Sequence, residues 1–280
     1  MPALFVLFWN TGFIGAKLGL PHVEPFTFLA VRFAIVAAIL IAAALVLRAP
    51  WPRTPIAWAR IAISGLLVQA TYLGGVFAGI HYGVSAGESA LIVSAQPFLT
   101  AVAAGPLLGK RITRRQWLGF ALGVVGVTLV VWNKIDFSAD HLLGLLFTFI
   151  ALFGITSGTL YQKRHGADMD LRSGSAIQFA ASAVPLGLLA LAFETMAITW
   201  HADLIFAMSW LVIVNSIITI TLLFLLIRRG AASKVASLFY LVPPVVAIIA
   251  FALFGEILGP MALAGMVLTV IGVALVTRGG

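Results

Sequence analysis

The sequence predicts an all-α integral membrane protein whose ten transmembrane helices form two inverted repeats of five helices. Composition predicts the membrane, because hydrophobic residues make up 62% of the 280 residues, charged residues only 9%, and mean hydropathy is +1.12. A water-soluble domain typically has about 25% charged residues. The second observation is a series of long apolar runs, and the third is an internal repeat. A soluble enzyme and a disordered tail are therefore excluded, and the absence of Cys excludes a disulfide scaffold.

Ten apolar runs are long enough to cross about 30 Å of hydrocarbon as helices. In chain order they span residues 2–20, 25–47, 55–80, 84–108, 115–132, 142–161, 173–194, 203–227, 231–254 and 260–277. Each run is continuous, whereas the strands of a membrane barrel would alternate over about 10 residues. The connections are short and leave no room for a soluble domain. The first run begins almost at Met1 without a basic segment or a small-residue cleavage motif, so no signal peptide is expected.

Lys and Arg are concentrated in alternate connections. If the N-terminus is cytoplasmic, the cytoplasmic connections and the C-terminal tail carry 14 of the 17 Lys and Arg residues. Lys134 is then the only basic residue in an external connection, and Lys17 and Arg32 lie within helices. Basic residues favour cytoplasmic loops, which face an anionic leaflet. The pattern predicts that both termini are cytoplasmic in a bacterial inner membrane, and it explains the net charge of +8 without nucleic acid.

The second half of the chain repeats the first at a nearly constant offset. Gly83-Val84-Ser85-Ala86 lies 147 residues before Gly230-Ala231-Ala232-Ser233, and Pro97 falls on Pro244 at the same offset. Arg32-Phe33-Ala34 likewise matches Gln178-Phe179-Ala180. Each half holds five helices, an odd number, so the second copy must cross the membrane in the opposite direction. We expect repeats over residues 1–133 and 142–280, an architecture typical of secondary transporters with a site near the bilayer midplane.

Short motifs throughout the chain carry a family resemblance. They are Trp9-Asn10 followed by Lys17, Arg32-Phe33, the segment from Ser85-Ala86-Gly87 to Pro97-Phe98, Pro243-Pro244, and Phe254-Gly255-Glu256. Together they resemble the drug/metabolite transporter (DMT) superfamily, in its EamA-type ten-helix branch. His81-Tyr82-Gly83 and the run from Gly87 to Ile92 are similar to the aromatic amino acid exporter branch, whereas Gly109-Lys110 departs from the acidic family pattern.

The resemblance implies a secondary transporter that exports amino acids or related small metabolites by alternating access. The alternatives are an exporter of drugs or sugar-type metabolites, or a channel. An integral membrane enzyme is disfavoured, because no nucleophile–base pair or paired carboxylates are visible. No metal site and no cofactor are expected, and the oligomeric state is open.

Three ionisable residues, Lys17, Arg32 and Glu88, lie within predicted helices. Charged side chains are expensive in a bilayer, so they mark functional sites or ion pairs. All three lie in the same half of the membrane, at depths that would permit a pair or a triad. For Lys17 and Arg32 we favour a structural ion pair, or contact of Lys17 with the headgroups. For Glu88, ammonium binding, proton coupling and structural pairing stay open.

Polar residues recur on single faces of several predicted helices, which indicates a shared cavity more than isolated helix contacts. The scarcity of charge deep in the bundle predicts a net-neutral or zwitterionic cargo. The candidate cavity residues are Trp9, Asn10, Gln69, Tyr72, His81, Tyr82, Glu88, Gln96, Tyr161, Trp210, Asn215, Thr219, Ser237 and Tyr240.

Prolines at matching positions predict hinges. Pro97 and its repeat partner Pro244, which follows Pro243, are expected in the middle of the fourth and ninth helices. Proline removes the hydrogen bond to the carbonyl four residues before it and bends the helix. A bend at corresponding points of two inverted copies would let one half open while the other closes.

Overall fold

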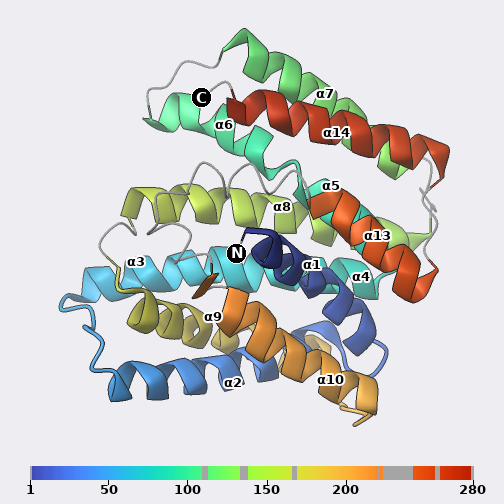
Figure 1. Cartoon of the computed structure of the whole chain (residues 1–280). Helices are drawn as coiled ribbons and strands as arrows, with labels where there is room; N and C mark the ends of the chain where they lie inside the picture. Colours follow the sequence, from blue (N-terminus) through green and yellow to red (C-terminus); the bar gives the residue numbers. More distant parts are fainter. Residues whose placement is uncertain are drawn as a thin grey trace.

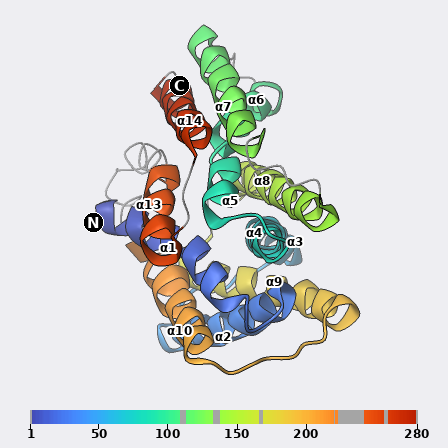
Figure 2. The same ribbon diagram turned by 90° about the vertical axis from the view of Figure 1, so that its right-hand side faces the viewer.

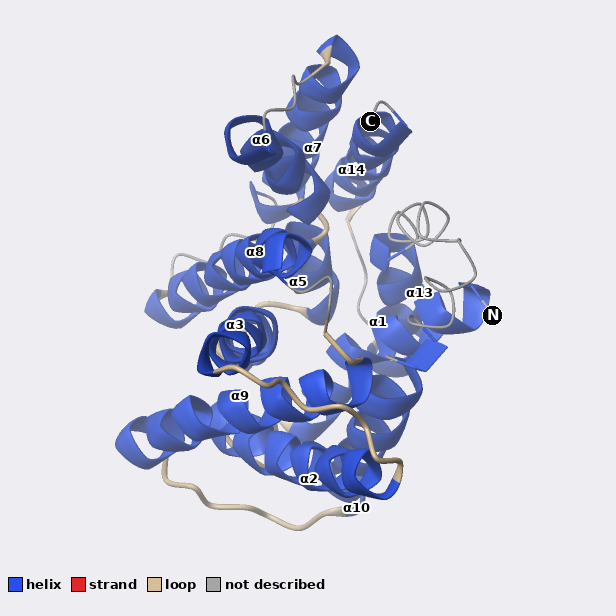
Figure 3. Ribbon diagram, turned by 90° about the vertical axis from the view of Figure 1, so that its left-hand side faces the viewer, coloured by secondary structure: helices blue, strands red, loops and turns tan. Residues whose placement is uncertain are grey.

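The protein folds as a bundle of helices joined by short loops (Figures 1 and 3). The computed structural model describes residues 2–108, 113–132, 138–165, 169–219, 221–222, 242–255 and 259–278. Within these ranges β-structure is limited to one isolated antiparallel bridge, between Val23 and Ile198. The predicted all-α fold is confirmed.

Every one of the ten predicted apolar runs contains a described helix. The elements are α1 Pro2–Gly19, α2 Pro25–Val46, α3 Pro55–Gly65, η1 Leu66–Thr71, α4 Tyr72–His81, α5 Ala86–Val93, α6 Gln96–Leu108, α7 Arg114–Trp132, α8 Ala139–His165, α9 Leu171–Phe193, α10 Ala202–Trp210, η2 Leu211–Ile218, α13 Val242–Phe254 and α14 Pro260–Arg278. The third run is α3, η1 and α4 in direct succession, the fourth is α5 and α6, and the described part of the eighth is α10 and η2.

By length and composition, four helices in the described chain can each cross a membrane: Pro25–Val46, Pro55–His81, Ala139–His165 and Leu171–Phe193. Shorter apolar helices cover Ala202–Ile218, Pro244–Phe254 and Pro260–Leu275. Many of the large side chains that the bundle leaves exposed are apolar, such as Phe153, Leu188 and Phe251. Such a surface suits lipid, in which an apolar side chain has no water to avoid.

Helix packing is preserved when the two halves of the chain are exchanged. The second span packs on the seventh (α2 on α9), and the fifth packs on the tenth (α7 on α14), at opposite sides of the bundle (Figure 1). The third span packs on the sixth through α4 and α8, and its counterpart is the eighth span on the first, through α10 and α1. In the view along the bundle, α4, α5 and α8 lie between these outer pairs (Figure 2).

The third and eighth spans each contain a wide, π-helical turn. These turns are η1 and η2, and adding the repeat offset of 147 to residues 66–71 gives 213–218, which lie within η2. The Thr71 hydroxyl at the end of η1 donates to the Leu66 carbonyl at 3.0 Å, and the Thr219 hydroxyl directly after η2 donates to the Val214 carbonyl at 2.7 Å, each across five residues. Single π-helical turns inside α-helices are rare and occur frequently at functional sites.

The expected bend at Pro97 is a complete break. Helix α5 ends at Val93, and α6 starts at Gln96, after a turn in which the Ala95 amide donates to the Ile92 carbonyl at 3.1 Å. The break spares Pro97 the clash that its ring would cause inside a continuous helix. Pro244 is the third residue of α13 as described, and because the preceding residues 223–241 lie outside the described chain, the expected bend there stays a prediction.

Glycine allows two central spans to touch through their backbones. A Cβ atom added to Gly75 in α4 would lie 2.5 Å from the Phe147 carbonyl oxygen of α8. Such a distance is shorter than real Cβ contacts, so α4 and α8 could not pack this closely with any larger residue.

Two glutamates join the halves at one end of the bundle. The Glu194 carboxylate accepts hydrogen bonds from the Phe26 and Thr27 amides, at 2.7 Å each, and from the Thr27 hydroxyl. Glu24 in turn accepts from the amide and the hydroxyl of Thr195, at 2.7 and 2.6 Å. We call this reciprocal arrangement the glutamate clasp. Glu194 and Thr195 belong to the connection between α9 and α10, which passes below α2 in Figure 2.

Candidate functional site

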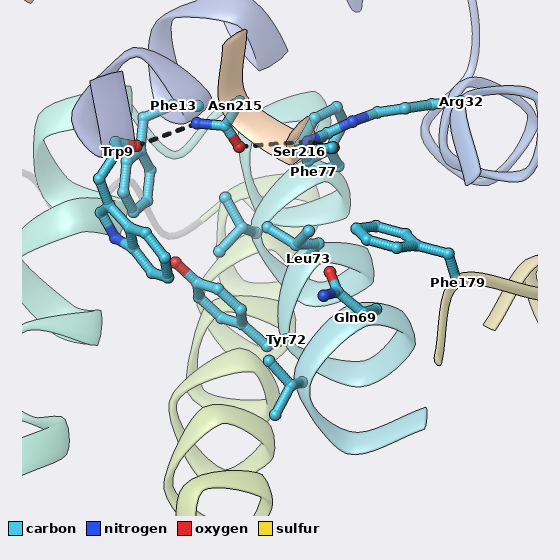
Figure 4. A pocket seen from close by; sticks show the side chains of 13 residues that line it. Trp9, Phe13, Arg32, Gln69, Tyr72, Leu73, Phe77, Phe179, Asn215 and Ser216 are labelled. Atoms are coloured by element: carbon cyan, nitrogen blue, oxygen red, sulfur yellow. Dashed lines mark hydrogen bonds between the residues drawn. The ribbon is translucent and has the colours of Figure 1, made fainter. Parts of the chain in front are cut away.

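A central cavity lies between the two halves of the chain (Figure 4). Its outline takes in about 580 Å³ of space not filled by atoms, and this figure includes space that is open to the surroundings. Helices α1, α2, η1, α4, α9 and η2 supply its walls, so both wide turns line it. The lining residues are Trp9, Gly12, Phe13, Arg32, Val68, Gln69, Tyr72, Leu73, Val76, Phe77, Phe179, Asn215 and Ser216.

Aromatic side chains form much of the cavity wall. Trp9 and Phe13 come from α1, Tyr72 and Phe77 from α4, and Phe179 from α9. The Phe179 ring packs edge-on against the ring of its repeat counterpart Phe33, with the ring centroids 5.3 Å apart and the planes at 66°. Aromatic faces offer a large apolar area to a ligand and lose little conformational freedom on contact.

The polar part of the cavity centres on Arg32, whose side chain is 1% exposed. Its Nη2 atom donates to Ser216 Oγ at 3.0 Å, to Asn215 Oδ1 at 3.2 Å and to the Leu211 carbonyl at 3.4 Å. All three acceptors belong to η2 and are uncharged. Neither Nε nor Nη1 of Arg32 has a hydrogen-bond partner among the described residues.

Asn215 connects this polar group to the first helix. Its Nδ2 atom donates to the Phe8 carbonyl at 3.0 Å, while its Oδ1 atom accepts from Arg32. On the opposite wall, Gln69 occupies the position in η1 that matches Ser216 in η2. The Gln69 amide lines the cavity and makes no side-chain hydrogen bond within the described chain.

A second, smaller cavity adjoins the first and shares Trp9, Phe13 and Tyr72 with it. Its other lining residues are Val93, Ser94, Gln96, Pro97, Ile155 and Val242. The break between α5 and α6 therefore forms part of its wall. The predicted cavity residue Gln96 lies here, where its Nε2 atom donates to Thr159 Oγ1 at 3.1 Å.

The three intramembrane charges do not form the triad that their depths permit. Lys17 lies over the Phe254 ring, 4.5 Å from its centroid. Glu88 is the third residue of α5 and exchanges hydrogen bonds with Ser85, which caps that helix. Arg32 contacts neither residue, because it reaches across to η2. The favoured ion pair for Arg32 is therefore wrong for the described chain.

Several predicted cavity residues lie away from both cavities. The Trp210 indole donates to Thr11 Oγ1 at 2.9 Å, and Thr219 closes η2. The Tyr82 ring stacks on Phe147 with centroids 5.7 Å apart and meets His81 edge-on, while Tyr161 packs on His165 at 4.5 Å. These contacts are all within the protein, and a role of these residues in a cavity stays a prediction.

Asn10 is fully buried, yet neither polar atom of its amide has a partner in the described chain, and it lines neither cavity. Ser237 and Tyr240 lie outside the described residues, as does the side chain of Pro243.

Sequence reasoning missed the arrangement of histidines near the glutamate clasp. His22 and His201 stack with centroids 4.7 Å apart, and Asp203 Oδ2 lies 3.2 Å from His201 Nδ1 and 3.9 Å from His22 Nε2. The sequence predicted no cluster of metal-ligating residues, but the potential ligand atoms of these three lie within 4.8 Å of one another. His22 lies about 180 positions before His201 and Asp203 in the sequence, so no local motif could reveal the cluster.

A polar cavity lies at another part of the bundle, between the α2–α3 and α8–α9 connections. Arg53, Arg60 and His165 line it together with Asp170. The Arg172 guanidinium donates to Asp170 at 3.1 and 3.2 Å and holds the pKa of that carboxyl below its usual value. Asp170 also accepts from the Arg172 amide and so caps α9.

Comparison with known proteins gives consistent similarities over the whole chain. The model of the EamA-like transporter family matches residues 2–132 and again residues 142–278. A probable amino-acid metabolite efflux pump of Salmonella typhimurium is 28% identical over 283 residues, covering 96% of this chain and 91% of that protein. The uncharacterized inner membrane transporter YedA of Escherichia coli K12 is 27% identical over 281 residues, covering 99% and 90%. A solved structure with 20% identity superimposes with a TM-score of 0.67 over 98% of this chain and 94% of that one, which shows a shared fold.

Proposed function

Because the chain belongs to the EamA-like transporter family, we propose that it exports amino acids or related small metabolites across a bacterial inner membrane by alternating access. Membership of a family of membrane transporters makes an enzyme function untenable. The cargo class is suggested by the name of the Salmonella relative. In this proposal both termini are cytoplasmic, as the distribution of Lys and Arg predicts.

The observation that carries the proposal is the central cavity between the halves. It takes Gln69 and Tyr72 from the third span, and Asn215 and Ser216 from the corresponding span of the second repeat. A secondary transporter needs a site that both halves can enclose in turn, and irregular helices commonly build it. The wide turns η1 and η2 supply that irregularity on both sides, and residues 1–133 and 142–280 act as the two moving units.

The cavity wall also bears on the alternatives. Five aromatic rings suit a cargo with an apolar or aromatic part. A sugar-type metabolite would need many more hydrogen-bonding groups around it. A channel would conduct without coupling one side to the other, so it would show no accelerated exchange of labelled cargo for unlabelled cargo.

Counterflow in liposomes tests the proposal. Purified protein is reconstituted with unlabelled amino acid inside, and uptake of labelled amino acid is followed across a panel of apolar, aromatic and polar amino acids. We expect uptake for some apolar or aromatic members and its loss in Tyr72→Ala, which removes a ring from both cavities. Trp117→Ala is the control, because this side chain is 52% exposed on α7. Counterflow of none of the panel members would refute amino-acid export.

A further inference from the structure

The central cavity contains a buried positive charge that no acidic residue of the described chain neutralises. Three neutral acceptors share the Nη2 atom of Arg32, while Nε and Nη1 stay without partners. The described acids are engaged or placed elsewhere. Glu24 and Glu194 form the clasp, Glu88 caps α5, and Asp140, Asp170 and Asp203 stand at helix starts. The remaining acids, Asp136, Asp168 and Glu256, lie outside the described residues.

An isolated guanidinium in a membrane interior is energetically unfavourable. Neutral hydrogen-bond acceptors stabilise it in part, but only an anion compensates the charge itself. The guanidinium also stays charged at any physiological pH, because arginine is not deprotonated in proteins. Arg32 lines the cavity, and its buried Nε and Nη1 atoms still lack acceptors, so a bound anion could compensate the charge through them.

We propose that Arg32 binds the carboxylate of the cargo, and that the aromatic wall receives its apolar or aromatic side chain. The inference rests on the proposed function and narrows it to carboxylates with an apolar body. Guanidinium and carboxylate match in charge and in hydrogen-bond geometry. Trp9, Tyr72 and Phe179 stand around the same cavity.

The carboxylate is then required for recognition, whereas the ammonium group of an amino acid is not. No acidic side chain among the described lining residues is available to bind an ammonium group. Uncharged groups such as the Gln69 amide can accept a hydrogen bond from it. The sequence-based expectation of a net-neutral or zwitterionic cargo thus widens to include organic anions, because Arg32 supplies the compensating charge.

The competing explanation is that Arg32 only fastens α2 to η2. A fastening role requires the hydrogen bonds of Nη2 but makes no use of Nε and Nη1. It also predicts that substitutions at Arg32 weaken all ligands equally. Discrimination between ligands that differ only in the carboxylate separates the two explanations.

Binding to purified protein in detergent tests the inference with three probes that share a phenyl ring: phenylalanine, 3-phenylpropionate and phenethylamine. For the wild type we expect both carboxylates to bind at least about tenfold more tightly than the amine, because a charge-assisted hydrogen bond of about 1.5–3 kcal/mol is at stake. Arg32→Gln should abolish this preference, and Arg32→Lys should restore part of it. Arg115→Gln, which removes an exposed charge from α7, should leave the preference unchanged.

The inference is overturned if the wild type binds phenethylamine as tightly as 3-phenylpropionate, if none of the probes binds, or if Arg32→Gln keeps the preference. Arg32→Lys guards against misfolding, because it retains a positive charge and should elute as a single species with a thermal midpoint near that of the wild type. A failure of the proposed function alone would give a different result: the carboxylates would bind with the expected preference, but liposomes would show no counterflow.

Discussion

Replacing Glu194 by alanine tests whether the glutamate clasp holds the two halves together. Glu194 acts as the capping side chain of α2, although it lies about 170 positions further along the chain. Its carboxylate accepts from the amides of the second and third residues of that helix and from the Thr27 hydroxyl, all at 2.7 Å. In Glu194→Ala the two amides at the start of α2 lose their acceptor.

The expected magnitude follows from these bonds. A hydrogen bond to a charged group contributes about 1.5–3 kcal/mol, and loss of a helix cap costs about 0.5–2 kcal/mol. Glu194 is only half-buried, so water replaces part of what is lost. We expect the free energy of unfolding to fall by about 2 kcal/mol, which lowers the Tm of a chain of this length by about 4–8 °C. Glu194→Gln should lose roughly half as much, because its amide oxygen still accepts.

The assay is thermal unfolding of detergent-solubilised protein, followed by intrinsic tryptophan fluorescence. Asp140→Asn is the matched control: it removes an exposed carboxylate at the start of α8. Glu24→Gln and the double variant with Glu194→Gln complete a cycle, in which the two sides of the clasp should reinforce each other. A Tm for Glu194→Ala within 1 °C of the control would refute the assignment of the clasp as a fastening between the halves.

Three further predictions concern packing, motion and orientation. Gly75→Val should force α4 away from α8 and reduce the yield of folded protein, because overpacking costs about 1–3 kcal/mol of stability. The control is the neighbouring Gly74→Ala, whose Cβ would meet Leu186 at an ordinary 3.4 Å. This control should behave as wild type in size-exclusion chromatography. Pro97→Ala should join α5 to α6 and lower the counterflow rate while cargo binding stays unchanged; an unchanged rate would show that the break is not a hinge. Because the chain has no Cys, single cysteines give clean labelling: with cytoplasmic termini, Asp140→Cys should react with an impermeant maleimide added outside intact cells and Arg115→Cys should not, and the opposite pattern would reverse the topology.

Much of the fold can be predicted from the sequence, because a membrane helix is recognisable from a single continuous stretch of residues. About 20 consecutive apolar residues have few other structures available in lipid, and each of the ten runs contains a described helix. The interruption of the helix before Pro97 could also be predicted from the sequence. Proline has no amide hydrogen, and its ring disturbs the helical turn in which it lies. The wide turns could not be predicted, because nothing in the composition of Leu66–Thr71 distinguishes it from an ordinary helix.

The site was less predictable because contacts across the bundle depend on helix rotation. Arg32 was identified as an intramembrane charge, but its acceptors lie 179 to 184 positions away in η2. Tyr72, Gln69 and Asn215 lie at the cavity as expected, whereas Trp210 faces Thr11. A polar or aromatic residue at membrane depth signals that it needs a partner, but the sequence does not say whether that partner is cargo or a neighbouring helix.

The matched wide turns bear on how the gene arose. A π-helical turn is an α-helix with one residue inserted, and the extra residue disturbs helix geometry whenever it appears. Two independent insertions at positions related by the same offset of 147 would be a coincidence. One insertion in an ancestral five-helix protein, copied when that protein's gene duplicated, accounts for both. The ancestor would then have carried this irregular helix already, and a pair of such chains facing each other in opposite orientations would have enclosed a symmetric forerunner of the present cavity.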